Sequence, residues 1–113
     1  MPYIKEERRK TVDECIEQMV GSLLLNVFRD SYDEKPTPEN LSSEELLSII
    51  GDINYCISRV VSKLMGKPAY SKIAMITGVL ENVKQEYYRR VGVILEDQKI
   101  LENGDIREYG KLQ

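Results

Sequence analysis

Basic and aromatic side chains are concentrated between residues 84 and 90, where the sequence reads KQEYYRR. The guanidinium group of arginine binds phosphate through paired hydrogen bonds, and the tyrosine ring offers a flat face for stacking. Lys84, Tyr88, Arg89 and Arg90, together with Tyr55 earlier in the chain, are therefore predicted to bind an anionic, nucleotide-like ligand. The alternative for the tyrosines is a partly exposed edge of the apolar core, which suits a ring with a polar tip equally well.

Arg90 interrupts an apolar repeat at helical spacing, which otherwise consists of Ile73, Ile76, Leu80, Val83, Tyr87 and Ile94. An arginine at such a position needs an anion or must reach outward to water. Glu86 stands four residues before it, which is the favourable order for an ion pair on a helix. Two interpretations follow: a surface ion pair, or an arginine that, supported by Glu86, orders a junction between subunits.

Several kinds of chemistry are excluded by composition. The chain contains no histidine, so Ser-His and Cys-His nucleophile pairs cannot form. Its two cysteines, Cys15 and Cys56, cannot supply a zinc site, and both are predicted to be reduced thiols in the apolar core. A magnesium-dependent hydrolase needs densely paired carboxylates, which are sparse here: Glu44, Glu45 and Asp52 in one predicted helix, Glu81 and Glu86 in another. No catalytic residue, metal ligand or cofactor is predicted.

Length and charge set the broad class of protein. The 113 residues suit one helical domain, residues 1–113, with an N-terminal arm over 1–10 and a C-terminal turn or tail over 98–113. The net charge of -3 and the pI near 5.1 argue against a general nucleic-acid binder. Neither a signal sequence nor an apolar run long enough to span a membrane is recognisable, so a soluble, cytoplasmic protein without membrane partners is expected.

Capping residues and apolar spacing predict three helices. Thr11 and Glu14 form a capping box before a helix that is expected to end near Tyr32. Ser42 and Glu45 form a second box, before a helix that continues to Leu64. Gly66 should stop this second helix in the left-handed region, and Pro68 follows it. The third helix is expected to begin at Ser71, which can cap it, and to run to about Asp97.

The C-terminal segment contains a turn signal, Asn103-Gly104-Asp105. Asn-Gly favours a type I′ turn, and apolar and polar residues alternate around it, so a short turn or hairpin is predicted. Asp105 can accept backbone hydrogen bonds in such a turn.

Together these elements predict an all-α fold, a three-helix bundle that is completed by oligomerisation. Asn54 falls on an apolar position of the second helix, where it would either fix the register of a subunit seam or lie at the edge of that seam. Gly51, Gly78 and Gly92 lie inside predicted helices, where each costs about 1 kcal/mol relative to alanine, so close helix crossings are expected. For Gly92 a bend is the alternative. We expect a homodimer or an assembly of dimers.

Four segments of the chain resemble a widespread family of small uncharacterised proteins that occurs in phages, prophages and some bacteria and archaea. The segments are MPYIKEERR at 1–9, GDINYCISR at 51–59, ITGVLENVKQEYYRRV at 76–91 and EDQKILENGD at 96–105. Matching motif positions are Asn54, Tyr55, Gly78, Glu81, Lys84, Glu86, Tyr88, Arg89, Arg90, Asn103, Gly104 and Asp105. The chain departs from the family pattern at four places. It has Asp52 where the family has Glu, Ile53 where it has Leu, Tyr87 where it has Phe, and Ile94-Leu95 where Pro-Tyr is expected. The resemblance implies a biological setting and no particular reaction.

Three functions remain open from the sequence. The first is a non-enzymatic oligomeric binding protein of phage type, which sequesters a nucleotide-like signal of host defence. The second is a protein-protein adaptor that modulates a host factor. The third, which the sparse carboxylates disfavour, is a magnesium-dependent all-α nucleotide hydrolase.

Overall fold

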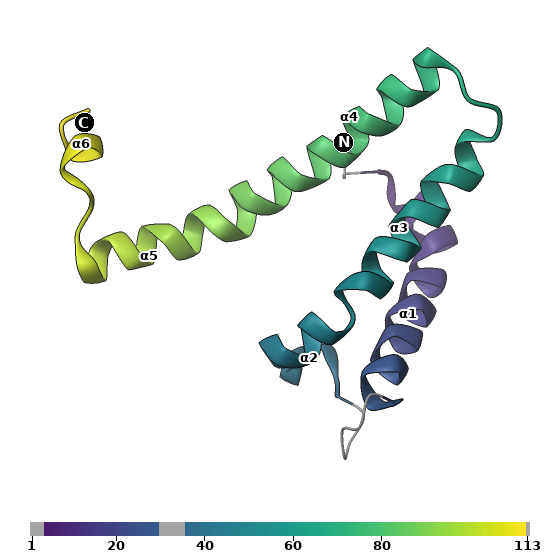
Figure 1. Ribbon diagram of the computed structural model, residues 1–113, viewed down its shortest axis with the longest axis horizontal. Helices are drawn as coiled ribbons and strands as arrows, with labels where there is room; N and C mark the ends of the chain where they lie inside the picture. Colours follow the sequence, from purple (N-terminus) through teal and green to yellow (C-terminus); the bar gives the residue numbers. More distant parts are fainter. Residues whose placement is uncertain (1–3, 30–35, 113) are drawn as a thin grey trace. The chain divides into compact units, whose positions relative to one another are not determined.

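The computed structural model describes residues 4–29 and 36–112, and all of its regular elements within these ranges are helices (Figure 1). The predicted all-α class is therefore confirmed. The chain divides into two compact units, one over Tyr3–Pro68 and the other over Ala69–Gln113. We call them the N-terminal and C-terminal units and describe each by itself. The three-helix bundle and its completion by oligomerisation stay predictions.

Helix α1, Glu6–Arg29, opens the N-terminal unit earlier than its sequence predicts. The capping box at Thr11 is wrong, because Thr11 lies inside the helix and residues 6–10 of the expected N-terminal arm form its first turns. Glu6 and Glu7 explain the earlier start, since acidic side chains stabilise the positive N-terminal end of a helix. The predicted end near Tyr32 lies outside the described residues.

The capping box at Ser42 is confirmed. The Ser42 hydroxyl accepts a hydrogen bond from the Glu45 amide at 3.1 Å, and the Glu45 carboxylate accepts one from the Ser42 amide at 2.9 Å. This box follows a single turn of 3₁₀-helix, η1, Pro38–Asn40, and begins α2, Ser43–Ser48.

A break at Ile49 divides the predicted second helix into α2 and α3, Ile50–Met65. Ile49 leaves the helical region at φ -113° and ψ 13° and is only 3% exposed. Leu24 and Val27 of α1 are the other large aliphatic side chains buried in the described part of this unit. We attribute the break to burial of Ile49, aided by the low helix propensity of the nearby Gly51.

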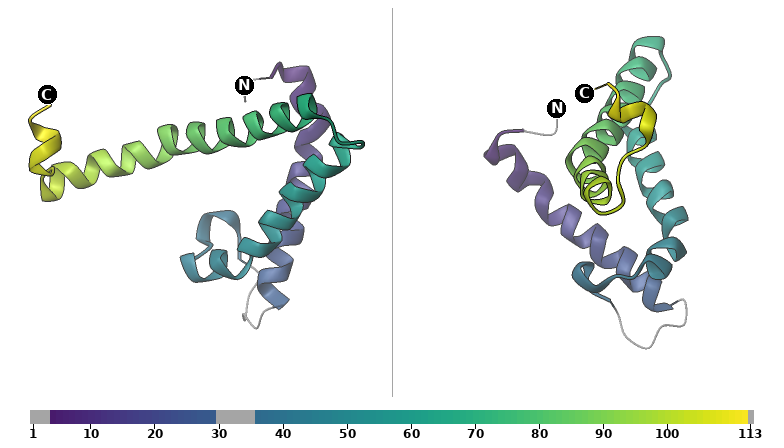
Figure 2. Two further views of the ribbon diagram at one scale, coloured as in Figure 1. Left: turned by 45° about the horizontal axis from the view of Figure 1, so that its top comes forward. Right: turned by 90° about the vertical axis from the view of Figure 1, so that its left-hand side faces the viewer.

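The predicted end of α3 at Gly66 is confirmed, and its amide donates to the Ser62 carbonyl at 3.3 Å, but with φ +59° and ψ -116° the residue lies outside the αL conformation expected there. Helices α1 and α3 approach each other near Asn26 and Asp52, whose side chains share a hydrogen bond of 3.2 Å. They diverge toward the start of α1 and the end of α3 (Figure 2, right).

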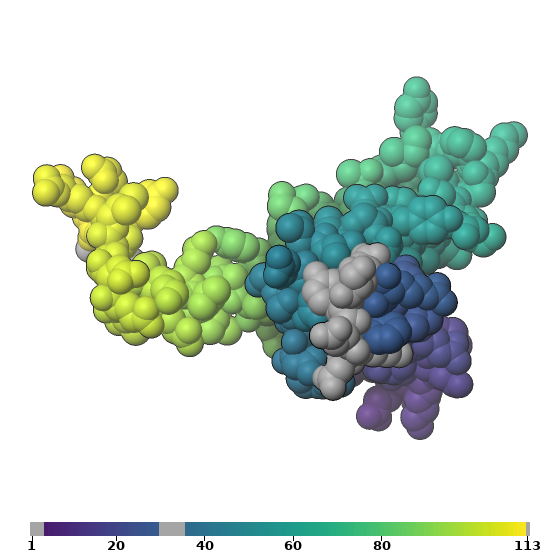
Figure 3. Space-filling model, turned by 60° about the horizontal axis from the view of Figure 1, so that its bottom comes forward, coloured from purple at the N-terminus to yellow at the C-terminus, as the bar shows by residue number. Residues whose placement is uncertain are grey.

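One almost continuous helix dominates the C-terminal unit. It consists of α4, Tyr70–Tyr87, a π-helical turn η2, Tyr88–Gly92, and α5, Val93–Asn103. Ala69 is the N-cap residue, so the predicted cap at Ser71 is wrong, and the helix continues past Asp97 to Asn103. Figure 3 shows α5, in yellow-green, as a rod one helix thick.

The chain changes direction after Asn103, but the predicted type I′ turn and hairpin are both wrong, because Asn103 is helical and Gly104 has a ψ of 155°. Gly104 has φ +86°, its amide caps α5 by donating to the Ile100 carbonyl at 2.8 Å, and a short helix α6, Arg107–Gly110, follows. Asp105 accepts a hydrogen bond from the Ile106 amide at 2.7 Å, as expected for this turn. The residues before the turn continue a helix and so cannot supply a strand.

The π-turn explains why Arg90 interrupts the apolar repeat. The Val93 amide donates to the Tyr88 carbonyl, five residues back, so the turn holds one residue more than an α-helical turn. Positions after it are shifted by about one residue, or roughly 100° around the helix axis. The repeat that includes Tyr87 therefore continues at Val91 and Leu95, and Arg90 is passed over. We call this set the apolar stripe: Ile73, Ile76, Leu80, Val83, Tyr87, Val91 and Leu95.

Most large apolar side chains of the described residues are exposed. In the apolar stripe Ile76 is half-buried, and the others range from 41% exposed at Leu80 to 67% at Tyr87. Both cysteines are free thiols as predicted, but Cys15 is exposed and Cys56 half-buried, so the predicted core position is wrong for Cys15. Among the described residues, no helix combines the length and the apolar character needed to cross a membrane.

Candidate functional site

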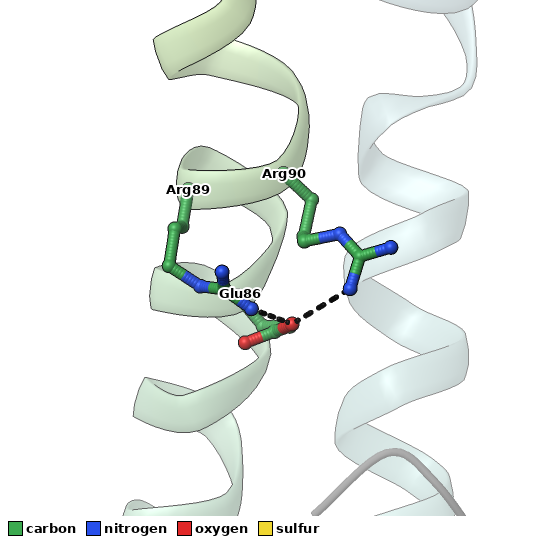
Figure 4. Close-up of polar contacts among 3 residues, drawn as sticks. All are labelled: Glu86, Arg89 and Arg90. Atoms are coloured by element: carbon green, nitrogen blue, oxygen red, sulfur yellow. Dashed lines mark hydrogen bonds and ion pairs between the residues drawn. The ribbon is translucent and has the colours of Figure 1, made fainter.

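Glu86 lies between the two arginines that the sequence predicts to bind a ligand. Its Oε1 atom is 2.6 Å from a terminal nitrogen of Arg89 and 3.7 Å from one of Arg90 (Figure 4). Both arginines are more than half exposed. The Glu86 carboxylate thus compensates part of the positive charge that Arg89 and Arg90 could offer to an anion.

Lys84 also has an acidic neighbour. Its ammonium group lies 3.8 Å from the Glu81 carboxylate, which accepts a hydrogen bond from the Gln85 amide at 3.1 Å. Exposed pairs of this kind contribute about 0.2–1 kcal/mol to stability. All three predicted cations of the stretch 84–90 therefore have a carboxylate within 4 Å.

Tyr88 is turned toward the following helix. Its hydroxyl donates to the Glu96 carboxylate, and this hydrogen bond, with smaller contributions from desolvation and the carboxylate charge, raises the pKa of Tyr88. The ring lies against Gly92, where an added Cβ would come within 2.7 Å of the Tyr88 Cδ2 atom. Tyr88 is thus engaged in the structure of the π-turn, which explains why residue 92 is a glycine.

The other predicted interface residues have a more open environment. Asn54 is exposed and accepts a hydrogen bond from the Ser58 hydroxyl at 3.2 Å. A Cβ at Gly51 or Gly78 would meet no atom within 4 Å, so the described chain itself makes no close crossing there. Asn103 is the last residue of α5. Whether these residues meet a second subunit stays a prediction.

Tyr55, the remaining predicted ligand residue, belongs to the N-terminal unit and lies on α3. A shallow hollow of about 410 Å³ is lined there by Tyr55, Ser58, Arg59, Ser62 and Lys63. The Arg59 guanidinium lies over the Tyr55 ring at 5.9 Å from its centre, within the range of a cation–π interaction. We call this set the basic hollow.

The basic hollow has donors and no acidic lining residue. Arg59 and Lys63 supply positive charge, and Ser62 adds a hydroxyl group. No ion pair of Arg59 or Lys63 occurs among residues 4–29 and 36–112, in contrast to the paired cations of the stretch 84–90. A phosphate group could therefore bind here without displacing a carboxylate.

A second hollow of about 350 Å³ opens between α1 and α3, and we call it the α1–α3 hollow. It is lined by Met19, Ser22, Leu23, Asn26, Asp52, Tyr55 and Cys56. Asn26 donates from Nδ2 to Asp52 Oδ2 at 3.2 Å, and the Asp52 side chain is half-buried. Tyr55 lines both hollows, so the two adjoin at its ring.

Sequence reasoning identified Tyr55 but missed its neighbours. The signal was present, since Tyr55, Arg59, Ser62 and Lys63 follow helical spacing and share one face of α3. Asn26 could not be found in this way, because its pairing with Asp52 depends on how α1 meets α3 in space.

No group of three or more His, Cys, Asp or Glu side chains within the described ranges is placed to hold a metal ion. Four of the five carboxylates considered for magnesium have other partners: Glu45 caps α2, Asp52 pairs with Asn26, Glu81 with Lys84, and Glu86 with the arginines.

Comparison with known proteins gives a family without an assigned activity. Residues 1–106 match the family model described as Domain of unknown function (DUF6899). No curated protein and no solved structure gives a significant match to the chain. The matched range includes both hollows and the whole stretch 84–90.

Proposed function

We propose that this chain, which belongs to the DUF6899 family, is a non-enzymatic binding protein for a phosphate-bearing, nucleotide-like ligand. The ligand binds at the basic hollow of α3, and the protein acts as a homo-oligomer. The sequence resemblance to phage proteins suggests the biological role. In that role the protein sequesters a nucleotide signal of host defence in the cytoplasm.

The observation that carries the proposal is the Tyr55–Arg59 stack inside a hollow without acidic side chains. A guanidinium held over a ring keeps its outer N–H groups free to form a fork with phosphate oxygens. Lys63 lies one helical turn beyond Arg59 and adds a second positive charge on the same face. The exposed Tyr55 ring also offers a surface on which a base could stack.

With the ligand at the basic hollow, the stretch 84–90 is no longer the first candidate for the ligand site. Arg89 and Arg90 are already paired with Glu86, so binding of an anion there would compete with an internal carboxylate. We therefore assign this stretch to assembly, in agreement with the interpretation that Arg90 and Glu86 order a subunit junction. The stretch remains the alternative ligand site and is tested as such.

Assembly through the apolar stripe is the second part of the proposal. The stripe extends over residues 73–95, about 33 Å of helix at 1.5 Å per residue. Contiguous exposed apolar surface of this extent marks an interaction site. A second copy of the chain suits it, because both signs of charge flank the stripe, as at Glu81 and Lys84, and a two-fold arrangement can place them opposite each other.

Binding of inorganic pyrophosphate and of guanosine monophosphate, measured by isothermal titration calorimetry with and without Mg²⁺, tests the ligand part. Arg59→Ala and Lys63→Ala should each weaken binding about tenfold or more, because a hydrogen bond to a charged group contributes roughly 1.5–3 kcal/mol. Arg89→Ala is the matched control, since it removes an exposed positive charge from the other unit.

Three results would redirect the proposal. Weakening by Arg89→Ala alone would move the ligand to the stretch 84–90. Magnesium-dependent loss of a nucleoside triphosphate would establish the hydrolase. A parent protein that binds neither probe under either condition would contradict ligand binding and favour the protein-protein adaptor.

A further inference from the structure

The α1–α3 hollow adjoins the basic hollow but differs from it in chemistry. The basic hollow offers donors and positive charge, whereas the α1–α3 hollow is rich in acceptors. Asp52 Oδ2 accepts one hydrogen bond, from Asn26, and no described residue donates to Asp52 Oδ1 or to Asn26 Oδ1. A carboxylate oxygen and an amide oxygen can each accept two. A group that binds to these two oxygens must therefore bring N–H or O–H donors.

The side walls of the α1–α3 hollow suit a flat ring. Met19 and Leu23 line it from α1, and Tyr55, which also lines the basic hollow, lines it from α3. Aromatic rings stack on such apolar and aromatic surfaces, while polar groups at the end of the hollow fix their orientation. The volume of about 350 Å³ lies within the range of small-molecule sites, about 300–1,000 Å³.

Helix geometry places the two hollows at a spacing that one nucleotide can bridge. Asp52 and Arg59 are seven residues apart on α3, which corresponds to about 10 Å along the axis and nearly the same direction around it. Tyr55 lies between them on this face. Along α3, Asp52 thus offers an acceptor for the edge of a base, Tyr55 a ring beside the base, and Arg59 donors for the phosphate. A nucleotide carries its base and its phosphate in the same order.

We infer that the α1–α3 hollow binds a guanine base, with Asp52 accepting from its N1–H and 2-amino groups while its phosphate occupies the basic hollow. This inference rests on the proposed function. The two neighbouring donors of guanine match the two oxygens of one carboxylate, as in other bidentate contacts. Hypoxanthine lacks the 2-amino group. Adenine would place its unprotonated N1 against the carboxylate, which offers no proton.

Calorimetric titration of the full chain with guanosine, inosine and adenosine monophosphates tests the inference. We expect guanosine monophosphate to bind about tenfold more tightly than inosine monophosphate, with adenosine monophosphate weakest. Asp52→Asn should remove the difference between the first two, because it replaces one carboxylate oxygen by a donor. Asp13→Asn on α1 is the control for loss of an acidic side chain and should leave the order unchanged.

The outcomes separate this inference from the proposed function. Equal binding of guanosine and inosine monophosphates to the parent, with loss of both in Arg59→Ala, would overturn the base contact and leave phosphate binding in place. Failure of every nucleotide and of pyrophosphate to bind would overturn both. The comparison within the parent needs no variant, so it decides the inference even if Asp52→Asn does not fold.

Discussion

At the scale of single residues, the Tyr88 side chain gives the π-turn a measurable signature. Its hydrogen bond to Glu96 raises the pKa of the phenol. Below the unfolded pKa of about 10 the phenol is protonated in both states, and the bond contributes its full stability. As the pH rises further, the unfolded chain ionises first, so this contribution is lost as the pH passes through the folded pKa.

We therefore predict that Tyr88 ionises above the ordinary pKa of a tyrosine phenol. Alkaline titration followed by ultraviolet absorbance should show a late phenol that disappears in Tyr88→Phe and persists in Tyr87→Phe. If the phenol removed by Tyr88→Phe ionises at the ordinary pKa of about 10, the hydrogen bond to Glu96 does not persist in solution.

Gly92 and Gly78 form a matched pair for a second test at this scale. Alanine stabilises a helix interior by up to about 1 kcal/mol relative to glycine, and at Gly78 the new Cβ would meet no atom within 4 Å. Gly78→Ala should therefore raise the melting temperature. At Gly92 the Cβ would lie 2.7 and 2.9 Å from atoms of the Tyr88 ring, so Gly92→Ala should displace the ring and forfeit this gain.

Equal stabilisation by the two substitutions would show that the ring does not lie on Gly92. A Gly78→Ala protein that loses oligomeric mass would instead support the close helix crossing that the sequence predicts at that glycine.

At the scale of elements, Gly104 determines where α5 ends. Its φ of +86° and ψ of +155° lie in a region that only glycine adopts readily, and another residue there costs about 1–3 kcal/mol. Gly104→Val should fray the last turn of α5 and lower the protection of its amides against hydrogen exchange. Gly110→Val is the control, since Gly110 does not have a positive φ. Identical protection in both variants would contradict an ordered turn.

Some of the element ends that depend on local chemistry can be predicted from the sequence. Ser42 with Glu45 begins α2 and Gly66 ends α3 as expected, both through their own or neighbouring backbone groups. Thr11 and Ser71 do not begin helices, and Gly104 ends a helix where a hairpin turn is predicted. The break at Ile49 and the π-turn at Tyr88 could not be predicted, because one accompanies burial of the Ile49 side chain and the other a ring packed on a glycine one turn away.

Of the basic hollow, only Tyr55 could be predicted from the sequence. Apolar spacing draws attention to helix faces that pack, whereas Arg59 and Lys63 lie on a polar face whose significance appears only when the hollow around Tyr55 is seen. The stretch 84–90 carries more charge in sequence, yet Glu86 and Glu81 compensate it in space.

At the scale of the whole molecule, the apolar stripe predicts association. Val83→Lys places a charge in the stripe and should shift sedimentation equilibrium toward the monomer, because burying an unpaired ammonium group in an interface is unfavourable. Gln85→Lys lies on the opposite face of α4, beside Glu81, and should leave the mass unchanged. A parent protein that is monomeric at every concentration tested would contradict the oligomer.

The location of a bound nucleotide is the most direct test of the central claim. Titration of the ¹⁵N-labelled chain with guanosine monophosphate should shift backbone amide resonances of α3 between residues 52 and 63 and of α1 near residues 19–26. Resonances of residues 84–90 should move little. Shifts confined to residues 84–90, or no shifts at saturating nucleotide, would contradict a nucleotide site on α3.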